Sequence, residues 1–166
     1  MTGVQTCALP IFYLVRHGEA TSKEQNSECP LTESGAKDVE QIAAWFTSTR
    51  LHVDEIRHSG KSRAQQTAEI FAQHLGLPEL PAETPGLNPN DDVQPMADSL
   101  RRESKSLMLV GHLPFMERLV RYLVVGDAEQ TIVNFDAAGV VVLQRDDDRW
   151  SIVCALSPQL LGSVAR

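Results

Sequence analysis

Arginine and histidine side chains follow two apolar segments of this chain, in an arrangement that suits phosphate chemistry. Arg16 and His17 come directly after the apolar run at residues 11–15, and His112 comes soon after the apolar run at residues 106–110. Ligands of open α/β sheets bind outside the carboxyl ends of the strands, so the two segments can share one pocket. Guanidinium groups hold anions through paired hydrogen bonds, and a neutral imidazole is an available nucleophile at pH 7.

A third basic segment, HSGKSRAQQTA at residues 58–68, follows a predicted strand and opens a predicted helix. Arg63 lies in the first turn of that helix, where it can point back over the strand end beside backbone N–H groups that favour an anion. Arg16 and Arg63 can each offer a planar fork to two oxygens of a phosphoryl group. We therefore predict that Arg16, His17, Arg63 and His112 surround one tetrahedral anion.

Neighbouring polar residues allow other interpretations. We interpret His58 as a strand-end residue rather than a substrate contact, and His52 and His74 as surface residues. Lys61 is either a substrate contact or a solvated lysine at the start of a helix. A zinc site built from His17, His58 and His112 is disfavoured, because it would place two arginines close to a dication.

Two further motifs point to ligands that we do not favour. Gly60-Lys61-Ser62 resembles the end of a Walker A phosphate loop, but that pattern requires a glycine at position 55, where the chain has Glu55. The acidic triplet 146–148 resembles a metal cluster, but it falls in a predicted hairpin turn, where we expect solvated carboxylates.

Short apolar runs alternate with helical patterns along the chain, which predicts an α/β domain. We expect strands at residues 11–15, 53–57, 106–110, 139–143 and 150–156, with helices at 32–48, 59–75, 91–103 and 115–125. Thr32 and Ser59 are the predicted helix N-caps, and Gly76 the predicted helix end. Residues 77–90, which are rich in proline, are predicted to be a loop, and residues 145–149 a turn. The expected architecture has three layers, α/β/α, with a mainly parallel sheet and helices on both faces.

Composition limits the partners and the compartment. The formal net charge of −7 disfavours nucleic acid and anionic membranes as partners. The three cysteines are widely spaced and form no CxxC pair, so we expect neither a disulfide framework nor a zinc ribbon, and a cytoplasmic location. Residues 1–10 (MTGVQTCALP) resemble translated adapter read-through, and we interpret them as a non-native extension of a single domain at residues 11–166.

Four motifs carry a family resemblance: LVRHGEA at residues 14–20, LTESG at 31–35, HSGKSRAQQTA at 58–68 and LVGHLPF at 109–115. Together they resemble the histidine phosphatase superfamily, which has the phosphoglycerate-mutase-like fold. Among its branches, the chain most resembles the small SixA-type phosphohistidine phosphatases. The match runs in order from about Ile11 to about Pro158.

The resemblance implies a role for each basic residue. His17 would attack phosphorus and carry the phosphoryl group, Arg16 and Arg63 would hold its oxygens, and a cationic His112 would complete the clamp. These groups would supply the positive charge, so we expect no metal and no other cofactor. Gly18 would keep the backbone close to the phosphate, where a Cβ could obstruct it.

The general acid is left open by the sequence. Larger superfamily members protonate the leaving alkoxide with a carboxylate, and Glu19, Asp91 and Asp92 are candidates by position only. A phosphorylated imidazole leaves far more easily than a sugar alkoxide, so a strong acid is less necessary for that substrate.

Phosphohistidine on a partner protein is the expected substrate, because the short chain leaves little for the insertions that enclose small sugar phosphates in larger relatives. Two alternatives are a phosphatase of small phosphomonoesters, such as sugar or nucleotide phosphates, and a non-catalytic phosphoprotein-binding module. The intact set of Arg16, His17, Arg63 and His112 argues against the binding module.

Overall fold

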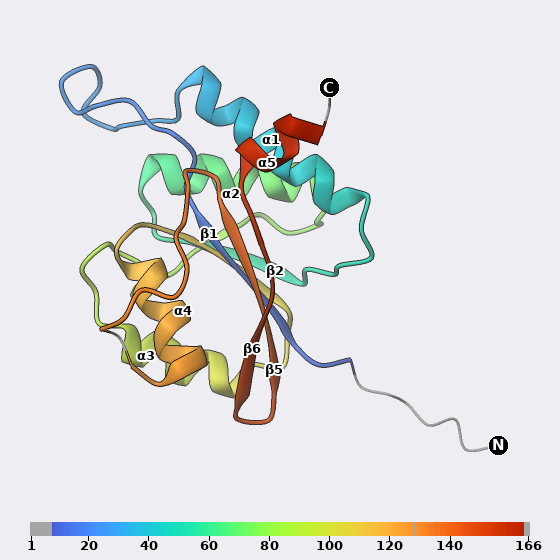
Figure 1. The fold of residues 1–166 in the computed structure, drawn as a ribbon. Helices are drawn as coiled ribbons and strands as arrows, with labels where there is room; N and C mark the ends of the chain where they lie inside the picture. Colours follow the sequence, from blue (N-terminus) through green and yellow to red (C-terminus); the bar gives the residue numbers. More distant parts are fainter. Residues whose placement is uncertain (1–7, 128, 165–166) are drawn as a thin grey trace.

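A mixed β-sheet forms the centre of the computed structural model, which describes residues 8–127 and 129–164 (Figure 1). In these residues the sheet has six strands, in the order β3-β2-β4-β1-β5-β6. The strands are β1 (Ile11–Arg16), β2 (Glu55–His58), β3 (Ala82–Glu83), β4 (Leu107–Gly111), β5 (Val140–Asp146) and β6 (Arg149–Leu156). The helices are α1 (Glu33–Thr47), α2 (Ser62–Leu75), α3 (Val93–Arg102), α4 (Phe115–Val125) and α5 (Pro158–Val164).

The four strands from β3 to β1 run parallel, which confirms the predicted mainly parallel sheet. β1 pairs with β4, and β2 pairs with both β4 and β3, while β5 and β6 complete the sheet as antiparallel strands. In this register Arg16 lies opposite Gly111, and His58 lies opposite Val110. The segments that follow β1, β2 and β4 therefore all begin at the same end of the sheet, where these parallel strands have their carboxyl ends.

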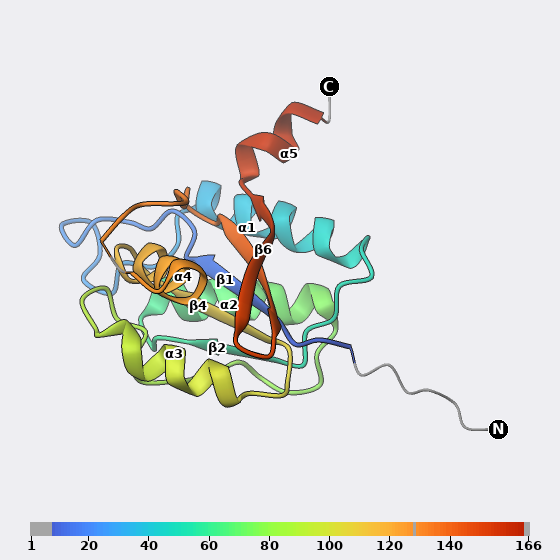
Figure 2. The same ribbon diagram turned by 60° about the horizontal axis from the view of Figure 1, so that its bottom comes forward.

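Helices cover both faces of the sheet, as expected for a three-layer fold. The views in Figures 1 and 2 place α1 and α2 on one face and α3 and α4 on the other. The sequence of β1 is apolar throughout because both faces of this strand are buried. Tyr13 and Val15 pack in the core beneath α1 and α2, while Phe12 and Leu14 pack in the core beneath α3 and α4. All four side chains are fully buried.

The helix boundaries confirm one predicted N-cap and correct the other. The Thr32 hydroxyl accepts a hydrogen bond from the Gly35 backbone N–H at 2.9 Å, as an N-cap does. Ser59 does not cap α2, whose N-cap is Lys61. The Ser59 hydroxyl instead lies 2.6 Å from Nε2 of His112, which explains the difference. Gly76 ends α2 in the left-handed conformation at φ +63°.

Two elements were not predicted: β3, which interrupts the expected loop at residues 77–90, and α5 after the last strand. The predicted turn at 145–149 is narrower than expected, because Asp146 still pairs with Arg149 across the hairpin. No described helix is both long and apolar enough to cross a membrane. Of residues 1–10, which we interpret as a non-native extension, residues 1–7 lie outside the described residues.

Candidate active site

His17 and His112 lie side by side at the carboxyl ends of β1 and β4. Their ring centroids are 4.9 Å apart, with an angle of 53° between the ring planes. The backbone N–H of His17 also donates to the Gly111 carbonyl at 3.1 Å, which continues the contact between the two strands beyond the paired residues. The structure thus brings together the two histidines expected to share one pocket.

The hydrogen bonds of His17 identify the nitrogen that can act as a nucleophile. Nδ1 lies 2.7 Å from the carbonyl oxygen of Gly18, which only accepts, so this geometry assigns the proton to Nδ1. The lone pair is then on Nε2, which accepts a hydrogen bond of 3.3 Å from Nε of Arg63. Arg63 reaches this position from the first turn of α2, as predicted from the sequence.

One guanidinium nitrogen of Arg16 donates a hydrogen bond to the protein backbone, and another has no hydrogen-bond partner among the described residues. Its Nη1 donates to the carbonyl of Phe135 at 2.8 Å. Its Nε is buried and has no hydrogen-bond partner among the described residues. Buried polar groups in native proteins are almost always paired, and a guanidinium N–H favours an anion, so this donor fits a phosphate oxygen.

A pocket of about 440 Å³ opens beside these groups. Arg16, His17 and Arg63 line it, together with Cys29 and residues 18–23 of the segment that follows β1. His112 is only 2% exposed and is not among the lining residues. His112 therefore lies beside His17 without lining the pocket, and three of the four predicted residues line it.

The surroundings of His17 keep its imidazole neutral at pH 7. The pKa of His17 is lowered to about 4, with burial as the largest cause and the charges of Arg63 and Arg16 acting in the same direction. The hydrogen bond to Gly18 opposes this shift only in part. A neutral His17 presents its lone pair without the help of a base, which is what a nucleophilic imidazole requires.

The protein's own groups act against a positive charge on His112. The pKa of His112 is lowered to about 3, with burial as the largest cause and nearby His17, Arg63 and Lys61 acting in the same direction. The protein's own groups thus favour a neutral His112 rather than the cation implied by the family resemblance. A phosphoryl dianion beside it would act in the opposite direction.

Gly18 is required for packing against α1. A Cβ at this position would lie 2.9 Å from both the carbonyl oxygen of Gly35 and Cγ2 of Val39, at the start of α1. The obstacle to a side chain is therefore the helix, and the expectation that a Cβ would obstruct the phosphate is not what the structure shows.

The three candidate acids lie in different surroundings. Glu19 is exposed and lines the pocket, and its Oε2 accepts a hydrogen bond of 3.1 Å from the Thr32 hydroxyl. Asp91 accepts from the Asn88 N–H at 2.9 Å, and Asp92 is the N-cap of α3. Neither aspartate lines the pocket, so the structure brings only Glu19 to it.

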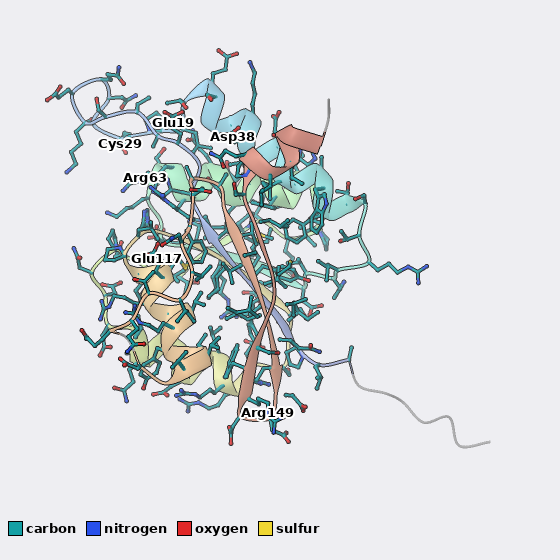
Figure 3. All side chains as sticks on the ribbon, viewed as in Figure 1. Glu19, Cys29, Asp38, Arg63, Glu117 and Arg149 are labelled. Carbon is teal, nitrogen blue, oxygen red and sulfur yellow. The ribbon has the colours of Figure 1, made fainter. Side chains whose placement is uncertain are left out.

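The remaining sequence candidates lie outside the pocket. His58 is 5% exposed, and its Nδ1 accepts from the Gly60 N–H, in keeping with a strand-end residue. His52 and His74 are exposed. The acidic triplet 146–148 belongs to the β5–β6 hairpin, which Figure 3 places, by its label on Arg149, at the end of the molecule opposite Arg63. Within the described residues, no group of three or more His, Cys, Asp or Glu side chains could hold a metal ion.

Sequence reasoning missed two hydroxyl side chains that support the site. Ser59 contacts Nε2 of His112, as described above. Thr67 is fully buried, accepts from the Gly18 N–H at 3.1 Å and donates to the Arg63 carbonyl at 2.7 Å. Thr67 therefore links the segment after His17 to the helix that carries Arg63. A threonine four residues after the arginine, able to bond back along the helix, was the available signal.

A neutral imidazole near two guanidinium groups, at the carboxyl ends of the parallel strands, is the arrangement expected of a phosphatase whose nucleophile is histidine. The comparisons with known proteins identify the same class. The model of branch 1 of the histidine phosphatase superfamily matches residues 12–88 of the chain. The family resemblance, the phosphoglycerate-mutase-like fold and the phosphatase activity predicted from the motifs are thereby confirmed.

Individual relatives extend the likeness beyond residues 12–88. The chain is 27% identical over 135 residues to the phosphohistidine phosphatase SixA of Escherichia coli K12, covering 78% of this chain and 84% of that protein. A structure of the protein histidine phosphatase SixA complexed with tungstate matches with a TM-score of 0.82 and 26% identity, over 91% of this chain and 99% of that one. A putative α-ribazole-5'-P phosphatase from Escherichia coli shares the fold, with a TM-score of 0.73 and 16% identity over 91% and 98% of the two chains.

Proposed function

We propose that this phosphatase hydrolyses phosphohistidine on partner proteins through a covalent phosphoryl intermediate on His17. The observation that carries the proposal is the environment of Nε2 of His17. This atom has a lone pair, belongs to an imidazole that stays neutral at pH 7, and lies next to Arg63. Arg16 lines the same pocket, and its buried Nε has no hydrogen-bond partner in the part of the chain that the structure describes.

The proposed reaction has two displacements. Nε2 of His17 attacks phosphorus in line, the bond between phosphorus and the substrate imidazole breaks, and that imidazole leaves with a proton from solvent. Water then attacks the phosphoryl group on His17, releases inorganic phosphate, and restores the neutral imidazole. Phosphoryl transfer depends chiefly on positioning and charge stabilisation, and we assign both to the guanidinium groups of Arg16 and Arg63.

His112 has a supporting part in this proposal. Its Nδ1 is buried and has no partner among the described residues, while Nε2 lies next to the Ser59 hydroxyl. A phosphoryl dianion in the pocket would raise its pKa and favour a proton on this free nitrogen. His112 would then add a positive charge as negative charge develops on the phosphoryl group.

The surroundings of the pocket support phosphohistidine as the substrate. Asp91 and Asp92 serve local turns and caps, so neither is placed to protonate a leaving group. A leaving imidazole tolerates this arrangement better than a leaving alkoxide, whose higher basicity demands an acid. The similar SixA protein is a phosphohistidine phosphatase, which agrees with this assignment.

One observation favours a second candidate, the hydrolysis of small phosphomonoesters such as sugar or nucleotide phosphates. Glu19 lines the pocket with an exposed carboxyl group, and a protonated carboxyl there could protonate a leaving alkoxide. Its hydrogen bond to Thr32 orients this group at the pocket rim.

A direct comparison of substrates tests the proposal. We would measure kcat/KM for a protein carrying phosphohistidine and for a panel containing glucose 6-phosphate and AMP, and quench the reactions to look for acid-labile phosphate on His17. We expect the phosphohistidine protein to be preferred by at least about 100-fold, which is a difference of at least about 2.7 kcal/mol in the barrier. Higher kcat/KM for a small phosphate would assign the second candidate. Tight binding without turnover and without labelled His17 would identify a binding module instead.

A further inference from the structure

The carboxylate of Glu117 holds the backbone that anchors Arg16. Oε1 of Glu117 accepts a hydrogen bond of 3.3 Å from the N–H of Phe135. The carbonyl of Phe135 in turn accepts a hydrogen bond of 2.8 Å from Nη1 of Arg16. We propose that Glu117 is a positioning residue, which sets the orientation of the Arg16 guanidinium through residue 135. This inference rests on the phosphate-binding role proposed for Arg16.

The segment that receives Arg16 needs an external anchor. Residues 131–135 form neither helix nor strand, so no helical or sheet hydrogen bonding fixes them. The side chain of Phe135 is only 4% exposed and packs in the core beneath α3 and α4. Glu117 adds a directional contact to this packing, and a carboxylate acceptor makes a stronger hydrogen bond than a neutral one.

The turn after Phe135 also contacts the backbone of the site. The Arg16 N–H donates to the Gly139 carbonyl, and the Ala138 N–H donates to the His17 carbonyl, each at 3.1 Å. Residues 135–139 therefore contact both the side chain and the backbone of the Arg16-His17 pair. A shift of this turn would move the guanidinium relative to the imidazole.

The position of Glu117 connects the turn to His112. α4 begins just after β4, and the Met116 N–H donates to the His112 carbonyl at 3.0 Å, so Glu117 lies one residue from this contact. Figure 3 shows Glu117 near the start of α4. The helix that follows His112 thus contacts the turn that holds Arg16. His112 and Arg16 are therefore both connected to the start of α4.

The experiment compares variants that keep or remove the acceptor. Glu117→Gln keeps an oxygen for the Phe135 N–H, whereas Glu117→Met removes it at similar volume and Glu117→Ala removes it with a loss of volume. p-Nitrophenyl phosphate would report kcat/KM, inorganic phosphate would report anion affinity as a competitive inhibitor, and thermal unfolding would report folding. Glu40→Ala, at an exposed position of α1, is the matched control for the lost charge.

We expect Glu117→Met and Glu117→Ala to lower kcat/KM by about 10-fold and to weaken phosphate inhibition, because the Phe135 N–H loses its partner. Glu117→Gln should stay within about 3-fold of the original protein, and Glu40→Ala should match it. In an Arg16→Ala background, Glu117→Met should change kcat/KM by less than about 2-fold, since a residue that acts through Arg16 has no effect once Arg16 is gone.

Two results would overturn the inference while leaving the proposed function intact. One is an undiminished effect of Glu117→Met in the Arg16→Ala background, which would show a purely structural role. The other is normal kcat/KM and phosphate inhibition in a folded Glu117→Met protein. If Arg16→Ala alone changed neither quantity, the phosphate-binding role of Arg16 would be wrong, and the inference would fail with it.

Discussion

Nε of Arg63 donates its hydrogen bond to Nε2 of His17, the same nitrogen that we propose as the nucleophile. The contact of 3.3 Å therefore aims the guanidinium at the point where phosphorus would bind. When Nε2 attacks, its lone pair becomes a bond to phosphorus, and Arg63 must transfer its hydrogen bond to a phosphoryl oxygen. A small rotation of the guanidinium suffices, because the nucleophile and the equatorial oxygens lie next to each other in this geometry.

The first prediction concerns the nucleophile. His17→Ala should lower kcat for p-nitrophenyl phosphate by at least about 1,000-fold, the scale on which loss of a nucleophile acts. The change trims a half-buried pocket residue, so the far-ultraviolet circular dichroism spectrum should stay unchanged. His74→Ala, at an exposed position of α2, is the control and should retain full activity. Turnover by His17→Ala within about 10-fold of the original would contradict the mechanism.

The second prediction separates the charge of Arg63 from its shape. Arg63→Ala should lower kcat/KM by about 100- to 1,000-fold, as the loss of an oxyanion donor does. Arg63→Lys keeps the charge but loses the planar fork, and it should recover only part of this loss. Steady-state kinetics checks both variants, with the exposed Arg50→Ala as the control. Equal rates for Arg63→Ala and Arg50→Ala would remove Arg63 from the site.

The third prediction concerns Thr67, which joins two parts of the site from beneath. Thr67→Val keeps the shape but removes the hydroxyl that accepts from the Gly18 N–H. A buried N–H left without a partner should lower the free energy of unfolding by about 1–3 kcal/mol. Thr67→Ser keeps the hydroxyl and serves as the control. Urea unfolding checks both variants, and equal unfolding free energies for Thr67→Val and the original protein would show that this hydrogen bond contributes nothing to stability.

Much of the fold is predictable because its signals are local. The run at residues 11–15 is apolar throughout, which is typical of a central strand buried on both faces, and Thr32 is the expected cap of α1. β3 has two residues, too few for a periodic pattern, and so it was predicted as loop. The order of strands that places β1 between β4 and β5 follows from tertiary packing, which no local pattern encodes.

In the site, the identities of the basic residues could be predicted from the sequence, whereas their contacts and charge states could not. The four residues Arg16, His17, Arg63 and His112 could be named because each is a basic residue that ends a strand, follows one or opens a helix. The acceptor for Arg16 is a backbone carbonyl, at Phe135, and a carbonyl gives no residue-type signal. The neutral state of His112 depends on its burial beside three basic groups, which only the folded structure shows.

The last prediction follows from the low pKa values of the paired histidines. In the unfolded chain a histidine binds its proton near pH 6.5, whereas folding lowers the pKa of His17 to about 4 and that of His112 to about 3. Between about pH 6.5 and pH 4 the unfolded chain therefore binds more protons than the folded protein. The free energy of unfolding should fall as the pH decreases through this window, and the contribution of the pair is fully present only above it.

Variants isolate this contribution from that of the carboxylates. His17→Asn should weaken the pH dependence of the free energy of unfolding between pH 6.5 and pH 4, by up to about one proton in the linkage slope. Because the rings of His17 and His112 touch, a His17→Asn/His112→Asn double variant should weaken it further. Urea unfolding at several pH values provides the measurement, with the exposed His74→Asn as the control. If His17→Asn and the original protein lost stability equally on acidification, the low pKa of His17 would be wrong, and its neutral imidazole would need another explanation.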